Sequence, residues 1–192
     1  MTILPDKVDT QQVVDRYKLE HRGPEGREES IRCLEKLSKE HEGNWVKVLI
    51  SRKDTLGVRL PEHKHDASVN LCENGIPVSV AAKRFKQAVL SNEPAECLDR
   101  IRSQEKRDFS RTCLFLQFQD NTLRHVDGLH RLLAYAIYGH TVQIPAFVVG
   151  LQHGQTASSA RNERTPKLVD GRVRSSSCEI PAGFPSSNST PI

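Results

Sequence analysis

A short polar turn, residues 127–131, carries the residue types with which proteins bind anionic groups. It consists of Asp127, Gly128, Leu129, His130 and Arg131, and it opens a stretch with the apolar period of an amphipathic helix. The first backbone N–H groups of a helix have no partner within it, and the helix dipole is positive at this end. Glycine lets a ligand approach the backbone, while histidine and arginine add donors and charge. The turn is therefore predicted to bind a phosphate or carboxylate group.

The same turn can be interpreted in two ways. In a phosphoryl-transfer interpretation, the N–H groups from Gly128 and Leu129 onward would bind a phosphate, and His130 and Arg131 would neutralise charge on the transferred group. Asp127 would orient the substrate or help to hold Mg²⁺. In a purely structural interpretation, Asp127 caps the helix, and His130 and Arg131 form a solvated first turn.

A hydroxyl nucleophile would also benefit from a general base within hydrogen-bond reach. Glu20, in the stretch Leu19-Glu20-His21, is the best candidate that the sequence offers. The alternative for this residue is a solvated glutamate ahead of a loop. The spacing along the chain leaves open whether Glu20 meets the polar turn.

The polar turn is surrounded by elements that could hold it in place. An apolar strand is expected at 112–118, followed by a hairpin turn at Asp120-Asn121 and a second strand at 123–126. The apolar residues that follow recur every three to four positions and predict a helix at 129–138, which ends at Gly139. A further strand is expected at 143–150. The turn would therefore join a strand to a helix.

The rest of the chain predicts one domain with extensions at both ends. A loose lead-in is expected at 1–14, the domain itself at 15–151, and a disordered tail, rich in serine and proline, at 152–192. Within the domain the pattern adds helices at 28–41, 77–90 and 93–108, a strand at 45–51 and a polar loop or irregular edge at 54–66. The expected core consists of Val46, Val48, Ile50, Leu114, Leu116, Leu132, Leu133, Ile137, Ile144 and Val148.

The block from Cys113 to Gly150 resembles the core of the ParB/sulfiredoxin superfamily (the ParB-like nuclease domain). In that superfamily a strand leads into a Gly-x-His-Arg type of turn, a helix, and a strand with an Ile-Pro start, here Ile144-Pro145. The Asp-Gly-x-His-Arg form is most similar to the free serine kinase branch. Sulfiredoxins carry a reactive cysteine where this chain has Leu129, so sulfinic acid reductase chemistry is not expected.

The resemblance implies a compact α/β (α+β) domain with a small mixed sheet and flanking helices. It also implies a nucleotide-dependent phosphotransferase, or a nucleotide hydrolase, that uses ATP or another nucleotide with Mg²⁺. Its partner would be a small molecule with a hydroxyl group. In serine-kinase relatives a His-Glu pair precedes the first helix, and Leu19-Glu20-His21 has a similar placement with the order reversed.

The amino-acid composition limits the classes of partner and the cellular compartment that are expected for this chain. The net charge is +4 with dispersed positive residues, and aromatic residues make up only 5%, so nucleic-acid binding is not indicated. Five well-separated cysteines and the lack of a signal pattern predict a reduced, cytoplasmic protein, and no apolar run is long enough to cross a membrane. Two other functions stay open: a ParB-like nucleotide-gated DNA-binding or nuclease-like protein, and a non-catalytic ligand-binding module of the same fold.

Overall fold

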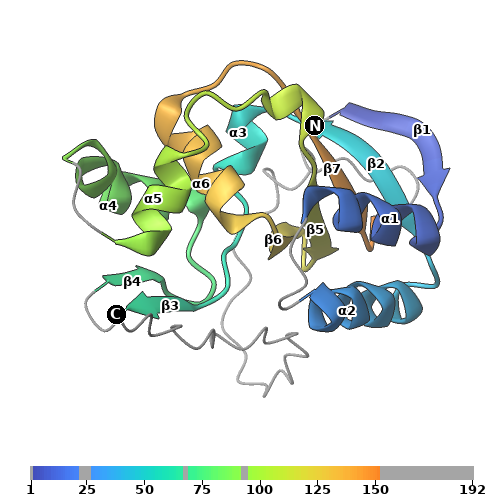
Figure 1. Cartoon of the computed structure of the whole chain (residues 1–192). Coiled ribbons are helices and arrows are strands. Elements are labelled where there is room, and N and C mark those ends of the chain that lie inside the picture. The colour runs from blue at the N-terminus through green and yellow to red at the C-terminus, as the bar shows by residue number, and fades with distance from the viewer. Residues whose placement is uncertain (1, 22–26, 67–68, 92–94, 152–192) are drawn as a thin grey trace, which may run out of the picture.

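Five strands form one mixed sheet, which lies between two groups of helices (Figure 1). The computed structural model describes residues 2–21, 27–66, 69–91 and 95–151. Strands are β1 (Thr2–Val8), β2 (Trp45–Ile50), β3 (His63–Asp66), β4 (Val69–Cys72), β5 (Leu114–Gln119), β6 (Thr122–Asp127) and β7 (Ile144–Val149). Helices are α1 (Thr10–Glu20), α2 (Arg27–Glu40), α3 (Arg52–Thr55), α4 (Val78–Leu90), α5 (Glu96–Arg102) and α6 (Leu129–Tyr138), with a short 3₁₀ helix, η1 (Phe109–Arg111). The predicted α/β class, with a small mixed sheet and flanking helices, is confirmed.

The strand order of the main sheet is β1-β2-β7-β5-β6, and β3 pairs with β4 in a separate hairpin-like sheet. Strand β7 is antiparallel to β2 and parallel to β5. β5 and β6 form an antiparallel hairpin whose two loop residues, Asp120 and Asn121, have φ of 50° and 57°. Positive φ at both positions matches the twist of the hairpin strands, and asparagine and aspartate tolerate it. Helix α6 then carries the chain from β6 to β7.

The side chains of the central strands alternate between two apolar clusters, one on each face of the sheet. Leu114 and Leu116 of β5 join the cluster under α4, α5 and α6. Phe115 of the same strand joins the cluster under α1 and α2, which also contains Trp45, and its ring meets that of Tyr17. Because each side of the sheet is covered by helices, β5 and β7 are apolar on both faces rather than on one.

The expected core residues are buried with one exception. Nine of the ten have side chains inside the cluster between the sheet and α6, whereas Val46 is only partly buried against it. Helix α6 has the predicted bounds, 129–138, and ends at Gly139 with a φ of 72°. A left-handed residue at this position is the usual end of a helix, and glycine adopts it without steric cost.

Three expectations about element bounds need correction. The segment 54–66, expected as a polar loop or irregular edge, begins within α3 and ends with β3, which pairs with β4. The segment 1–14, expected as a loose lead-in, contains β1 and the start of α1, because the β1 backbone pairs with the edge of β2. Pro5, Asp6 and Lys7 interrupt any apolar alternation there, so the pattern did not indicate a strand. The helix expected at 93–108 is shorter: α5 ends at Arg102, and turns lead from it to η1. The tail at 152–192 lies outside the described residues.

Within the part of the chain that the structure describes, no helix is both long enough and apolar enough to cross a membrane.

Candidate functional site

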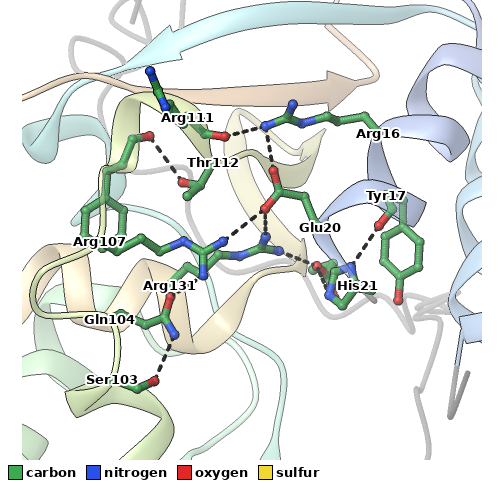
Figure 2. Close-up of polar contacts among 12 residues, drawn as sticks. Arg16, Tyr17, Glu20, His21, Ser103, Gln104, Arg107, Arg111, Thr112 and Arg131 are labelled. Atoms are coloured by element: carbon green, nitrogen blue, oxygen red, sulfur yellow. Dashed lines mark hydrogen bonds and ion pairs between the residues drawn. The ribbon is translucent and has the colours of Figure 1, made fainter. Parts of the chain in front are cut away.

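The end of α1 and the start of α6 meet in a cluster of charged side chains. Glu20, the last residue of α1, accepts a hydrogen bond at Oε2 from Arg131 Nη1 over 2.7 Å. Arg131 Nη2 donates to Asp127 Oδ2 over 2.8 Å. The side chains of Glu20 and Arg131 are only 5% and 8% exposed. One buried guanidinium therefore bridges two carboxylates that are far apart in the sequence, as Figure 2 shows for Glu20 and Arg131.

The bend between β6 and α6 fixes the position of Arg131. Asp127 ends β6, and Gly128 follows it with φ 97°, as the residue that precedes α6. A Cβ on Gly128 would lie 2.8 Å from Leu114 Cδ2 and 3.0 Å from Arg131 Nη2. The space that the glycine leaves is therefore filled by the protein's own leucine and arginine. Glycine at this position lets Arg131 fold back over the bend, rather than leaving the expected open approach for a ligand.

The structure also corrects the proposed capping role of Asp127. The residue at the cap position is Gly128, and no side chain caps α6. The first i to i−4 hydrogen bond of α6 runs from Leu132 N–H to the Gly128 carbonyl. The N–H groups that precede Leu132 therefore have no acceptor within the helix. The carboxylate of Asp127 instead binds Arg131 and His21.

His21 links α1 to the end of β6. Its Nε2 lies 3.2 Å from Asp127 Oδ2, and its Nδ1 lies 3.1 Å from the Tyr17 carbonyl oxygen. The ring also stacks on Tyr17, with 4.2 Å between the ring centroids. Each ring nitrogen therefore faces an oxygen atom, one from α1 and one from the end of β6.

Two further arginines contact Glu20. Arg16 Nη2 donates to Glu20 Oε1 over 2.6 Å and to the Arg111 carbonyl over 2.5 Å. Arg107 Nη2 approaches Glu20 Oε2 at 3.4 Å, and its Nη1 donates to Gln104 Oε1 over 2.8 Å. Figure 2 shows that these side chains converge on Glu20 from α1 and from the connection between α5 and β5. We call Arg16, Glu20, His21, Arg107, Asp127 and Arg131 together the ion cluster.

The ion cluster holds more positive than negative charge. Three guanidinium groups face two carboxylates, before any charge on His21 is counted. Burial raises the pKa of Asp127, but the hydrogen bond and charge of His21, together with the charge of Arg131, outweigh it, so this pKa lies below its ordinary value. Burial and the adjacent Arg131 charge lower the pKa of Arg107, while Glu20 opposes this effect. Both shifts reflect a partly desolvated group of charges at short range.

The structure brings three of the four predicted catalytic residues together. Glu20, Asp127 and Arg131 belong to the ion cluster, whereas the Nε2 of His130 lies 3.2 Å from the Sγ of Cys97 in α5. Leu129, expected to bind a phosphate through its backbone, has a buried side chain. Sequence reasoning missed Arg16 and Arg107. The i,i+4 spacing of Arg16 and Glu20 on one helix was an available signal, but nothing local marked Arg107.

No group of three or more His, Cys, Asp or Glu side chains is placed to hold a metal ion within the described residues. Both carboxylates of the ion cluster are already bound by guanidinium groups, which is a poor fit to a Mg²⁺ ion held by the protein alone. A surface hollow of about 480 Å³ lies at the corner between β1 and α1. It is lined by Lys7, Val8, Asp9, Thr10, Gln12 and Gly43, so it includes no residue of the ion cluster.

The fold and the ion cluster define an α/β protein with an arginine-rich polar site at a helix start. The chain belongs to the family of unknown function DUF6309, whose family model matches residues 1–166. No curated protein and no solved structure shows significant similarity to the chain.

Proposed function

We propose that this protein is a nucleotide-dependent phosphotransferase, which transfers a phosphoryl group to a hydroxyl of a small molecule at the ion cluster. The observation that carries the proposal is the contact of Glu20 with Arg131, at 2.7 Å, next to the start of α6. A candidate base, a guanidinium group and the N–H groups of a helix start then lie in one place. Phosphoryl transfer depends on these components, because its catalysis consists chiefly of positioning and charge stabilisation.

In the proposed reaction the hydroxyl oxygen of the substrate bonds to the terminal phosphorus of the nucleotide. The bond from that phosphorus to the bridging oxygen breaks, the nucleoside diphosphate leaves, and the hydroxyl proton passes to Glu20. Arg131 holds the Glu20 side chain in place and, with the N–H groups that open α6, adds positive potential near the transferred group. Asp127 and His21 hold Arg131 and the end of β6 in place.

Mg²⁺ in this proposal arrives with the nucleotide. Mg²⁺ bound to phosphates commonly retains several waters and needs few protein ligands. This is consistent with two carboxylates that are occupied by arginine. ATP is the first nucleotide to test, and the likeness of the turn to the free serine kinase branch of the ParB/sulfiredoxin superfamily supports that choice. We also propose a reduced, cytoplasmic setting, because the five cysteines of the chain are well separated in the sequence.

A second candidate is a non-catalytic ligand-binding module. The observation that favours it is that both oxygens of Glu20 accept hydrogen bonds from arginine in the structure. A carboxylate held in this way acts as a base only after one partner leaves. The two candidates therefore differ in whether nucleotide binding is followed by chemistry.

The experiment is ³¹P NMR of the full chain with ATP, Mg²⁺ and a pool of amino acids and other hydroxyl metabolites. The wild type should produce ADP and a new phosphoester. Glu20→Gln should lower the rate by about 10²–10⁴ if Glu20 is the base. Glu73→Gln is the matched control, because Glu73 pairs with Arg84 in an exposed ion pair at 3.1 Å.

Nucleotide binding without ADP or a phosphoester would contradict transfer and favour the binding module. Cleavage of added plasmid DNA would favour the nuclease-like alternative instead. A Glu20→Gln variant as active as Glu73→Gln would remove Glu20 from the reaction.

A further inference from the structure

Arg107 and Arg16 are the more accessible of the three guanidinium groups that contact Glu20. Their side chains are 37% and 34% exposed, against 8% for Arg131. Arg107 and Arg131 approach the same oxygen, Glu20 Oε2, but the Arg107 contact is 3.4 Å long and the Arg131 contact is 2.7 Å. The Arg107 contact is therefore the weaker of the two, since charge-assisted hydrogen bonds are normally about 2.7–2.9 Å long.

The other two arginines are held more firmly. Arg131 bridges Glu20 and Asp127. Arg16 binds the other Glu20 oxygen and also the Arg111 carbonyl. Arg107 lies in the turns between α5 and η1, where its second contact is to the neutral side chain of Gln104. An anion that enters the ion cluster would compete most easily for Arg107.

The local charge favours an exchange in which Arg107 leaves Glu20 and binds an anion instead. Arg107 and Arg131 are like charges beside one carboxylate oxygen, and the ion cluster as a whole has surplus positive charge. A doubly charged phosphate group would screen the repulsion between the two arginines. A phosphate would also offer the planar guanidinium of Arg107 two oxygens to bind side by side. The single Glu20 oxygen that Arg107 shares with Arg131 offers only one.

We infer that Arg107 is the phosphate-binding residue of this site and that it moves from Glu20 to the terminal phosphate of an incoming nucleotide. The inference rests on the proposed function. The exchange removes one donor from Glu20 Oε2, so that this oxygen accepts the hydrogen of the substrate hydroxyl. The nucleotide therefore binds before the hydroxyl substrate, and Glu20 becomes available as a base only when the phosphate is present.

The test compares Arg107→Ala and Arg107→Lys with the wild type in the full chain. Arg84→Ala is the matched control, because Arg84 is 46% exposed and pairs with Glu73 at 3.1 Å outside the ion cluster. Isothermal titration calorimetry with Mg²⁺–ATP, and separately with inorganic pyrophosphate, gives the affinities. Initial rates at varied nucleotide and hydroxyl substrate give the binding order and the KM for each.

Arg107→Ala should weaken binding of both phosphate probes about 10- to 100-fold, because a charge-assisted hydrogen bond is lost. Arg107→Lys should recover only part of this loss, since an ammonium group does not bind two oxygens in the same fork geometry. Arg84→Ala should bind as the wild type does. Millimolar guanidinium ion should partly restore the Arg107→Ala variant, which a merely structural defect would not allow.

A wild type that transfers phosphate, with an Arg107→Ala variant that binds and turns over like Arg84→Ala, would overturn the inference and leave the proposed function standing. A wild type that binds the probes through Arg107 but transfers nothing would support Arg107 as the phosphate-binding residue and overturn the transferase proposal. Binding of neither probe by the wild type would overturn both.

Discussion

Arg131 Nη1 lies 2.7 Å from Glu20 Oε2, although 111 residues separate the two in the chain. The contact joins the helix that ends at Glu20 to the helix that begins at Leu129. Asp127, the other partner of Arg131, ends the edge strand β6. Arg131 is therefore a structural residue of the domain as well as part of the proposed site. Substitutions in the ion cluster must be judged by stability before they are judged by activity.

The first prediction is that Arg131→Ala destabilises the fold strongly. It leaves Glu20 and Asp127 without the guanidinium that bridges them, and removal of one partner of a buried ion pair costs about 3–5 kcal/mol. Urea denaturation followed by circular dichroism measures the free energy of unfolding. Arg84→Ala, which breaks an exposed pair, should cost at most about 1 kcal/mol. Equal effects of the two substitutions would show that the buried bridge contributes no special stability.

The second prediction concerns the dependence of folding stability on acidic pH. The folded-state pKa of Asp127 lies below its ordinary value of 3.8, because His21 and Arg131 outweigh the effect of burial. The stability that this carboxylate contributes is therefore fully present above pH 4–5, and it is lost as the pH falls from the unfolded-state pKa through the lower folded-state pKa.

Asp127→Asn measures this contribution. At pH 7 the wild type should exceed the variant by about 1–3 kcal/mol in free energy of unfolding, because a buried charged partner is lost. The difference should shrink as the pH falls below about 4. A difference that grows as the pH falls from about 4 to about 2 would contradict the assigned direction of the shift.

The sequence predicted those parts of the fold that depend on neighbours in the chain. The 129–138 helix was predicted at its observed bounds because its apolar period and its terminal glycine are local signals. Asp120-Asn121 likewise indicated the hairpin between β5 and β6. β1 was not predicted because it forms by backbone pairing with β2, and Pro5 and its charged neighbours interrupt the apolar alternation that is typical of a strand.

The candidate site was predictable only in part, for the same reason. The turn at 127–131 carried a local pattern, and Glu20 could be named as a base, but no spacing along the chain linked Glu20 to Arg131. Arg107 lies in turns where a helix was expected, so neither a period nor a motif marked it. The role of Gly128 was visible as a glycine before a helix, but its crowding by Leu114 and Arg131 depends on the folded sheet.

The third prediction is that the Cys113 thiol is inert in the folded protein. Burial is the main cause that raises the pKa of Cys113 to about 12, so almost no thiolate exists at pH 8. Iodoacetamide at pH 8, followed by digestion and mass spectrometry, should leave Cys113 unmodified in buffer and modify it in urea. Alkylation of the native protein at the rate seen in urea would show that the thiol is accessible and ionised.

The last prediction separates crowding from backbone strain at two glycines. Gly128 has φ 97°, and a Cβ there would meet Leu114 and Arg131 at 2.8–3.0 Å. Gly75 has a similar φ of 79°, but a Cβ there would meet nothing within 4 Å. Gly75→Ala therefore suffers only the left-handed backbone cost of about 1–2 kcal/mol. Gly128→Ala suffers that cost and a steric cost of about 1–3 kcal/mol from overpacking.

Chemical denaturation of the two alanine variants gives the comparison directly. Gly128→Ala should be the less stable variant. Leu114→Ala should cost less in the Gly128→Ala background than in the wild type, because the shortened side chain removes the closest contact. In the Gly75→Ala background, Leu114→Ala should cost as much as it does in the wild type. Equal stabilities of the two glycine variants would mean that Arg131 and Leu114 move aside at little cost. The close packing of the β6–α6 bend would then not be what holds Arg131 against Glu20.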